Sequence, residues 1–522
     1  MQSQTLHWVD YTIIITILVA SVGFGGYFAN RQKSTNKYFK GGGTIPAWAL
    51  GMSILATIIS SVTFLAYPGA AYKSNWILLV QGLMVPVVLL SIVWFIVPLY
   101  RDVIGLSAYE YFEKRFGVVA RLYSSVGFIL AHFSKMGTVF FLLAVALSSM
   151  MGVNTYLILW VLGISIITLT LLGGIEAVIW LDVFQGFMFI VGGLLTLGIL
   201  LFVPAGGPTA VLKIAYENNK MGFGPYDLDF TKLTFIVLVL NGIFYAIQKY
   251  GTDQTIIQRY LVAKSDKAAI KASLIGVLLC IPVWAMFMFI GTCLFSYYKI
   301  TGASLPANIK ADAVFPYFIV NEMPIGIIGL VISALIAAAV STLDADMNCL
   351  AAIGVEDYYC RIKKNTTDKQ KLTMGKIFVV FSGLGALGIA TIYIESGGEG
   401  VLGIIFGLYA IFSAGIAGLF LLGIFSKRAN KQGLYIGMAT CVLFTAYALL
   451  TSMKVDFGNG PTLILDLGKF NFTHHDYMLG VYSHVILFGV GWAASFLFPK
   501  REIDKNLTIY SYIEKRKQGE VR

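Results

Sequence analysis

A polar stripe interrupts a long apolar run between about residues 324 and 358. Ala338, Ser341 and Thr342 follow the spacing i, i+3, i+4, so a helix places them on one face, next to the acids Asp344 and Asp346. Hydroxyl, carbonyl and carboxylate oxygens are the ligands that a hard cation such as Na+ prefers. We interpret the stripe as half of a cation site near the middle of a bilayer. The alternative is a packing seam of small residues whose hydroxyls bond back to their own helix. The acids weigh against that alternative, because ionised residues at this depth are rare.

Two further apolar segments contain a polar interruption. The first is the run of hydroxyls from Thr57 to Thr63, and the second is the polar stretch from Tyr245 to Gln254, which contains Gly251. Paired broken helices in the two halves of a transporter indicate a binding site at mid-membrane. We therefore predict a helix break in each segment. The alternative for each is a kink whose free backbone groups are satisfied by Ser or Thr hydroxyls.

Single ionisable residues occur at the same depth. Lys135 is too central in its span to reach the interface, so it pairs either with a protein acid or with an anionic substrate. Lys249 either gates a pocket or reaches the inner interface. Asp182 either caps its helix or joins Asp344 around a second cation. We interpret His132, one turn before Lys135, as a core histidine rather than a ligand.

Composition places these residues in a membrane. The chain has 522 residues, of which 57% are hydrophobic and only 12% are charged, and its mean hydropathy is +0.78. No soluble globular domain has this balance, so we predict an all-α polytopic membrane protein. The apolar runs predict about 13 transmembrane helices, near residues 11–30, 46–72, 76–99, 121–150, 155–173, 178–204, 233–252, 270–297, 324–358, 373–394, 400–425, 433–452 and 478–498.

The two interrupted segments are the second and seventh of these spans. A separation of five spans is what a LeuT-type core of two inverted five-helix repeats requires, here about residues 46–204 and 233–425. No loop is long enough to form a separate unit. We therefore predict one transporter domain over residues 1–498 and a basic cytoplasmic tail over residues 499–522.

The positive charge of the chain sets its expected orientation. Most of the 38 Lys and Arg residues, including those of the predicted loop 259–271, fall in alternate connections, which the positive-inside rule assigns to the cytoplasm. We expect a multi-pass protein of the inner (plasma) membrane, with the N-terminus outside and the C-terminus cytoplasmic. The net charge of +11 is then explained by the cytoplasmic loops, and we expect no binding of nucleic acid. The expected partners are the lipid bilayer and a small-molecule solute, with no obligate protein partner.

Other classes of membrane protein explain the sequence less well. An enzyme needs a nucleophile or an acid–base group near the interface, and none stands out, so we expect no enzymatic activity. A sensor or transceptor usually carries a signalling domain, for which the short tail leaves no room. A channel has no substrate-dependent Na+ uptake. The spans and their interruptions favour a Na+-coupled secondary active symporter that works by alternating access.

The segment from Gly173 to Gln185 reads GGIEAVIWLDVFQ, and it is supported by the segments 38–43, 107–113, 323–327 and 422–430. Together they resemble the sodium:solute symporter family, which includes the sodium/glucose, proline and sialic acid symporters. Leu181 stands where that family usually has a hydroxyl residue. The nearest branch is the bacterial sialic acid symporters. The resemblance implies an importer of an anionic sugar such as sialic acid or a related sugar acid, and a neutral sugar or polyol is the alternative.

The resemblance also implies the ion sites. The main Na+ site falls on the carbonyl oxygens of Ala56, Ile59 and Ala338 and on the hydroxyls of Ser341 and Thr342, the stripe that the residue spacing also indicates.

A second Na+ site of the sialic acid branch maps onto Asp182, Ser341, Asp344 and Ala345. Here Asp344 replaces a serine and supplies a stronger ligand, whereas Ala345 supplies none. We expect a second Na+ at Asp182, Ser341 and Asp344. A proton shared between the two carboxyl groups is the alternative, because close carboxylates resist joint ionisation.

The expected solute contacts also follow from the resemblance. An arginine at the position of Lys135 holds the substrate carboxylate in the sialic acid branch, and a lysine keeps the charge but not the bidentate geometry. Lys249 takes the position of a gating tyrosine of the sugar symporters. The residues expected to bind solute are Ser60, Thr63, Gln81, Lys135, Gln248 and Lys249.

Overall fold

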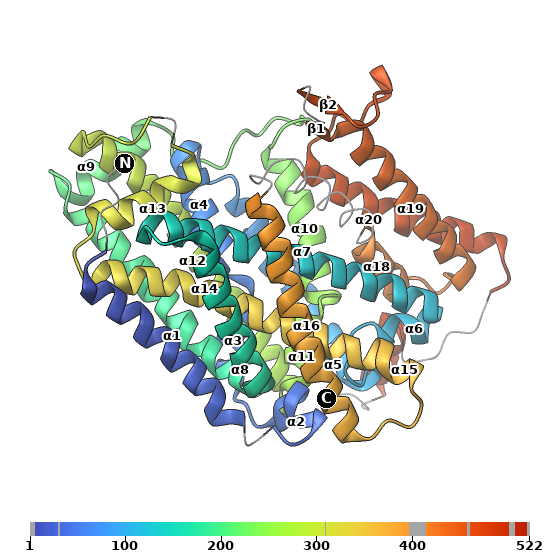
Figure 1. Cartoon of the computed structure of the whole chain (residues 1–522). Helices are drawn as coiled ribbons and strands as arrows, with labels where there is room; N and C mark the ends of the chain where they lie inside the picture. Colours follow the sequence, from blue (N-terminus) through green and yellow to red (C-terminus); the bar gives the residue numbers. More distant parts are fainter. Residues whose placement is uncertain are drawn as a thin grey trace.

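Helices make up almost the whole of the structure. The computed structural model describes residues 6–29, 32–307, 309–395, 414–456, 460–500 and 507–518, and these residues form a helical bundle with one two-stranded hairpin (Figure 1). This arrangement confirms the predicted all-α membrane class.

The elements of the first half of the chain are α1 (Trp8–Ala29), α2 (Thr35–Lys40), η1 (Gly41–Gly43), α3 (Ala47–Ile58), α4 (Ser61–Lys73), α5 (Leu79–Val103), α6 (Glu110–Phe116), α7 (Val118–Met151), α8 (Thr155–Phe202), α9 (Gly207–Glu217), α10 (Phe235–Gly251) and α11 (Gln254–Val262). The elements of the second half are α12 (Asp266–Thr301), α13 (Ala311–Glu322), α14 (Ile327–Ile353), the π-helical turn η2 (Gly354–Tyr359), α15 (Cys360–Ile362), α16 (Asp368–Glu395), α18 (Ile416–Phe425), α19 (Lys431–Ser452), β1 (Lys454–Asp456), β2 (Pro461–Leu463), η3 (Gly468–Phe470), α20 (Asp476–Ala494), η4 (Ser495–Leu497) and α21 (Ile509–Lys517).

Helix α14 lies at the centre of the bundle. The most apolar stretch of its span is 89% buried, whereas the corresponding stretches of the other spanning helices are 22% to 61% buried. It packs against α1, α7, α8 and α16. Asp10 of α1 accepts hydrogen bonds from the backbone N–H groups of Gly326 and Gly329, which have no acceptor within the first turn of α14. The polar stripe therefore sits on the most enclosed helix of the described residues.

The long helix α8 contains two predicted spans that run in opposite directions. A straight helix of its 48 residues is about 72 Å long, more than twice the ~30 Å apolar core of a bilayer. Gly174 breaks the helix with φ +57° and ψ −169°. Before the break, Leu169 of α8 lies against Gly25, near the end of α1. After the break, Gly192 of α8 lies against Ala334 of α14. Ala334 is in the half of α14 that contacts the start of α1. The chain therefore reverses at Gly174.

The predicted number of about 13 transmembrane helices is not confirmed. The described residues contain nine helices that are long and apolar enough to cross a membrane, or up to eleven if each bent helix pair counts as one span. One reason for the difference is that the predicted spans 155–173 and 178–204 share the helical run α8. Another is that much of the predicted span 400–425 lies outside the described residues.

Both predicted helix breaks are present. Ile59 and Ser60 separate α3 from α4. Thr252 and Asp253 separate α10 from α11, which are bent by 45° relative to each other. Each break ends on a residue whose side chain caps the next helix, Ser60 for α4 and Asp253 for α11, and this explains why the helix restarts there.

The basic tail is attached to the bundle where the structure describes it. The Tyr510 hydroxyl of α21 donates to the carbonyl oxygen of Phe425 at 3.1 Å, and the Tyr512 hydroxyl donates to that of Trp94 at 2.8 Å. The tail helix therefore contacts the end of α18 and the second half of α5.

Candidate functional site

The first helix break meets the polar stripe of α14. The Ser341 hydroxyl lies 3.0 Å from the carbonyl oxygen of Ala56 and 3.1 Å from that of Ala338, and the Thr342 hydroxyl lies 3.2 Å from the same Ala338 oxygen. Because α3 ends at the break, the carbonyl oxygen of Ala56 has no continuing helix to bond with. Ile59, in the break itself, lies in the same group. The structure thus brings together all five residues of the predicted main Na+ site.

A small cavity lies at this junction. Its volume is about 10 Å³, close to the smallest space that holds one water molecule, and Ala56, Ile59, Ala338 and Ser341 are in its lining. A gap of this size can admit a single small ion after the Ser341 hydroxyl turns its hydrogen away from it.

Asp182 is buried and already has two partners. Its Oδ2 accepts hydrogen bonds from the Ser53 hydroxyl at 2.5 Å and from Nη2 of Arg259 at 3.0 Å. The Arg259 guanidinium also donates to the carbonyl oxygen of Thr255 at 2.6 Å. Asp182 therefore anchors α11 to α8 and α3 in addition to any role with a cation.

Asp344 is equally buried but has no such partner. No side chain among the described residues donates to either of its carboxylate oxygens. Asp182 and Arg259 are the charged groups that act on it most strongly. Two carboxylates and one guanidinium carry a formal charge of −1, so this group of residues has room for one compensating cation.

The position of Arg259 corrects the sequence analysis, which assigns residues 259–271 to a cytoplasmic loop. Arg259 is only 1% exposed and belongs to α11, inside the bundle. The assignment was wrong because the short polar helix after the second break has the composition of a loop. Only its packing against Asp182 shows that the charge is buried.

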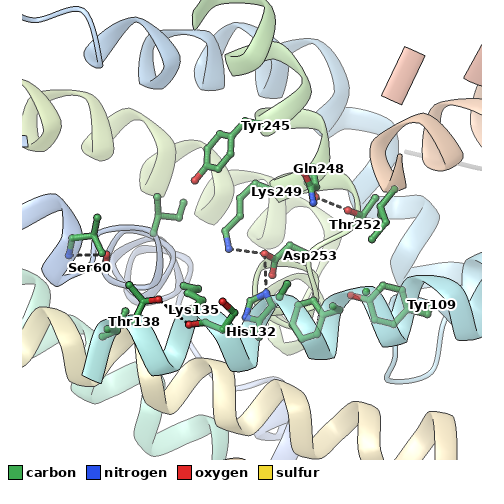
Figure 2. Close-up of a pocket in the computed structure, with 18 residues that line it drawn as sticks. Ser60, Tyr109, His132, Lys135, Thr138, Tyr245, Gln248, Lys249, Thr252 and Asp253 are labelled. Carbon is green, nitrogen blue, oxygen red and sulfur yellow. Dashed lines mark hydrogen bonds and ion pairs between the residues drawn. The ribbon is translucent and has the colours of Figure 1, made fainter. Parts of the chain in front are cut away.

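A pocket of about 440 Å³ opens beside the first break (Figure 2). This volume is within the range of sites for small organic ligands. Its walls come from α7, α10 and both helix breaks. The polar residues in its lining are Ser60, Tyr109, His132, Ser134, Lys135, Thr138, Tyr245, Gln248, Lys249, Thr252 and Asp253.

Two ion pairs lie in the wall of this pocket. Nζ of Lys135 is 3.0 Å from Oδ2 of Asp346 on α14, and Nζ of Lys249 is 2.6 Å from Oδ2 of Asp253. His132 lies between the two acids. Its Nδ1 is 2.9 Å from Oδ1 of Asp346. Its Nε2 is 3.6 Å from Oδ2 of Asp253, the acid that Figure 2 shows beside it. The Lys135 side chain is 32% exposed, whereas Asp346 is fully buried. Of the alternatives for Lys135, the structure shows a protein acid as its partner, with the ammonium group still open to the pocket.

The predicted solute ligands fall into two groups. Those that line the pocket are Ser60, Lys135, Gln248 and Lys249. Gln81 does not line it, because its side-chain amide donates to Oδ1 of Asn241 at 3.0 Å between α5 and α10. Thr63 is buried in α4, outside the lining. As solute ligands, all six remain predictions.

Sequence reasoning missed the role of three acids and bases of these sites. His132 was interpreted as a core residue, Asp253 received no role, and Arg259 was placed in a loop. A signal for the first was present, because His132 and Lys135 are one helical turn apart in mid-span and therefore share a face. Nothing in the local sequence of Arg259 distinguishes it from a loop cation.

Several known proteins are similar to this chain. A sequence model of the Sodium:solute symporter family matches residues 38–441. A sodium/sialic acid symporter of Aliivibrio fischeri is 34% identical over 446 residues, which cover 85% of this chain and 88% of that protein. A sodium/sialic acid symporter of Proteus mirabilis is 33% identical over 472 residues, covering 87% of this chain and 95% of that protein.

One solved structure shares nearly the whole fold. It is a substrate-bound, outward-open state of a Na+-coupled sialic acid symporter, with a TM-score of 0.86 and 30% identity, and the match covers 95% of this chain and 99% of that one. This similarity confirms the predicted transporter fold.

Proposed function

Because the chain belongs to the sodium:solute symporter family, we propose that it imports an anionic sugar, sialic acid or a related sugar acid, together with Na+. It is a Na+-coupled symporter of a small solute and a multi-pass membrane protein, not an enzyme. The observation that carries the solute class is Lys135, a partly exposed cation in a pocket that adjoins the sodium junction.

Sodium links the first helix break to α14. Its ligands are the carbonyl oxygens of Ala56, Ile59 and Ala338 and the hydroxyls of Ser341 and Thr342. These oxygens come from two separate elements, so the ion holds the break against α14. Ser60 of the same break lines the solute pocket. Sodium and solute therefore favour the same arrangement and bind cooperatively, with a coupling free energy of typically ~1–3 kcal/mol.

A second cation binds at Asp344, with Ser341 and Asp182 as its other ligands. The unpartnered carboxylate of Asp344 and the net charge of −1 support this site. The ion is Na+ or, alternatively, a proton shared between the two acids. One charge that crosses a potential of ~100 mV contributes about 2.3 kcal/mol, and a solute anion that enters with it costs the same amount. The membrane potential therefore drives accumulation of an anionic solute only if a second cation enters.

The solute carboxylate binds Nζ of Lys135, which turns from Asp346 towards the pocket. Ser60, Gln248 and Lys249 supply the hydrogen bonds that sugar hydroxyls need. A neutral sugar or polyol is the second candidate. It is favoured by one observation, that Lys135 already has Asp346 as its partner and so needs no anion to neutralise it.

The proposed topology is one membrane domain with a short tail. Residues 1–498 form one transporter domain with core repeats over about 46–204 and 233–425, and residues 499–522 form a basic tail. The N-terminus is outside and the C-terminus cytoplasmic in an inner (plasma) membrane, supported by the uneven distribution of Lys and Arg. The transporter works without an obligate protein partner.

Sodium coupling is tested by uptake into proteoliposomes. Radiolabelled sialic acid should accumulate with an inward Na+ gradient and not with an inward K+ gradient. Thr342→Ala should need about 10- to 150-fold more Na+ for half-maximal uptake, because a hydrogen-bonding group that faces a charge is worth about 1.5–3 kcal/mol. Thr445→Ala is the matched control, since Thr445 is also buried and bonded to its own helix, on α19. Sodium-independent uptake of sialic acid and of every sugar acid tested contradicts the proposal.

The solute class is tested by Lys135. Lys135→Met should abolish sialic acid binding in a thermal-shift or calorimetric assay while leaving the Na+-induced shift in place. Lys135→Arg should retain binding, because it keeps the charge and adds a bidentate donor. Saturable binding of a neutral sugar by both the wild type and Lys135→Met supports the second candidate instead.

A further inference from the structure

His132 lies between the two acids of the pocket wall, in a position that the symport mechanism does not use. We propose that His132 is a proton-binding site, and that the pocket takes up one proton when it binds an anionic solute. This inference rests on the proposed solute class and adds a second coupling ion, H+, at a site separate from the sodium junction.

The surroundings of the ring can stabilise its protonated form. Its two nitrogens lie near carboxylate oxygens of different elements, 2.9 Å from Asp346 of α14 and 3.6 Å from Asp253 of the second break. A neutral imidazole has one N–H group and one lone pair, so one of these oxygens would meet a lone pair and be repelled. An imidazolium carries N–H groups on both nitrogens and attracts both acids. The ring is held in this orientation by stacking on Phe128, with 3.7 Å between ring centroids.

The charges around the ring balance without the proton. The ionisable groups that face it are Asp346 from α14, Asp253 from the second break, Lys249 from α10, Lys135 from its own helix α7, and Tyr109 from the segment before α6. The two lysines and two aspartates sum to zero, and the tyrosine is neutral at physiological pH. A solute carboxylate would therefore bring an uncompensated negative charge into an enclosed site, which is unfavourable.

A proton on His132 removes this imbalance. It moves from bulk water onto the lone pair of the imidazole, and no bond between protein and solute is formed or broken. The pocket then has a charge of +1, which matches one carboxylate. Bound solute and bound proton therefore stabilise each other by the same factor, as linkage requires.

The consequence is a pH-dependent affinity with a defined sign. An unperturbed histidine takes up its proton near pH ~6.5, whereas a sugar carboxylate loses its proton at a much lower pH. At a pH where the solute-free ring is neutral, solute binding must take a proton from water. The proton concentration in water falls as the pH rises, so binding becomes less favourable. The Kd for solute should then increase by up to about tenfold per pH unit.

The first test measures binding of sialic acid to the full chain in lipid nanodiscs at saturating Na+. We expect the wild type to lose up to about tenfold in affinity per unit over part of the range from about pH 5.5 to 8.5, and His132→Gln to show a constant Kd. Calorimetry in buffers of different ionisation heat should find about one proton taken up per sialic acid bound by the wild type and none by His132→Gln. His474→Gln, a histidine outside the pocket, should behave as the wild type. An equal slope in His132→Gln, or sialic acid binding without proton uptake in the wild type, overturns the proposal. His132→Asn replaces His132→Gln if the latter does not fold.

A second readout does not depend on sialic acid. The chain has five histidines, so the ring signals of 15N-histidine-labelled protein can be resolved by magnetic resonance, and His132 is identified by the signal that the substitution removes. We expect bound solute to extend the doubly protonated state of the His132 ring to a higher pH. Failure of sialic acid to bind at any pH rejects the proposed solute. In that case the ring signal of His132 alone tests the proton site. A His132 ring that stays neutral down to about pH 5.5 overturns the proton site.

Discussion

Two buried charge clusters lie on opposite sides of α14. The ion cluster consists of Asp182, Arg259 and Asp344. The pocket cluster consists of Lys135, Asp346, His132, Asp253 and Lys249. Each takes one acid from α14, and since Asp344 and Asp346 are two positions apart, their side chains point about 160° apart around the helix. The same helix therefore contributes the same type of residue to two sites.

The clusters differ in net charge and in access. The ion cluster has a formal charge of −1 and is fully buried, so only a small cation can enter and compensate it. The pocket cluster is neutral before His132 is counted, and it borders a cavity of about 440 Å³. What an acid on α14 does is thus decided by the helices that face it. Among the described residues, Asp344 has only the positive charge of Arg259, which pairs with Asp182, in its surroundings, whereas Asp346 contacts a lysine and a histidine of α7.

Removal of Arg259 should have the largest effect, because it breaks the ion cluster. Arg259→Gln leaves two buried carboxylates without a cation, and the loss of one partner of a buried pair costs about 3–5 kcal/mol of stability. Thermal unfolding in detergent should show a lower midpoint, which Na+ or acid partly restores. Arg101→Gln removes a more exposed arginine, which bonds to Asp266 and to the carbonyl oxygens of Tyr260 and Ala263, and it should cost less than Arg259→Gln. Equal losses of thermal stability in the two variants would contradict the prediction that the buried ion cluster depends on Arg259.

The two acids of α14 should respond differently to the same substitution. Asp344→Asn removes the charge that attracts the second cation, and we expect half-maximal uptake to need about 10- to 150-fold more Na+ at fixed pH. If the site holds a shared proton instead, Asp344→Asn keeps the Na+ dependence and changes only the pH dependence of uptake. Asp346→Asn is the matched variant. It should leave the Na+ dependence unchanged and alter solute binding, and the reverse pattern would contradict the division between the clusters.

Substitution of Ser60 should have the smallest effect of the three. Ser60 lies in the first helix break, between the sodium junction and the solute pocket, so both sites should be affected. Ser60→Ala removes one hydroxyl from the pocket and the cap of α4, which together are worth about 1–2 kcal/mol, or roughly 5- to 30-fold in solute affinity. Thr63→Val removes a buried hydroxyl of the same helix outside the lining. A larger loss of solute binding in Thr63→Val than in Ser60→Ala would restore Thr63 as a ligand, as the sequence predicts.

Much of the ion site could be predicted from the sequence because it depends on local patterns. Helical periodicity placed Ser341 and Thr342 on one face, and the hydroxyl run predicted the break between Ile59 and Ser60. The resemblance then pointed to Ala56, whose carbonyl oxygen lies 3.0 Å from the Ser341 hydroxyl, although its role as a ligand stays a prediction. The solute pocket was predicted less completely, since Gln81 has another partner and His132 was set aside.

The sequence by itself determined that the chain consists mainly of apolar helices, where two of its segments break, and that Ser341 and Thr342 share a face of α14, because each of these follows from residues less than a few turns apart. Only the tertiary structure decided how the charges pair. Arg259 reaches Asp182 on another helix, and His132 joins acids from α14 and from the second break. The cost of a buried charge depends on what lies across from it, and residues that meet from distant parts of the chain leave no periodic signal in the sequence.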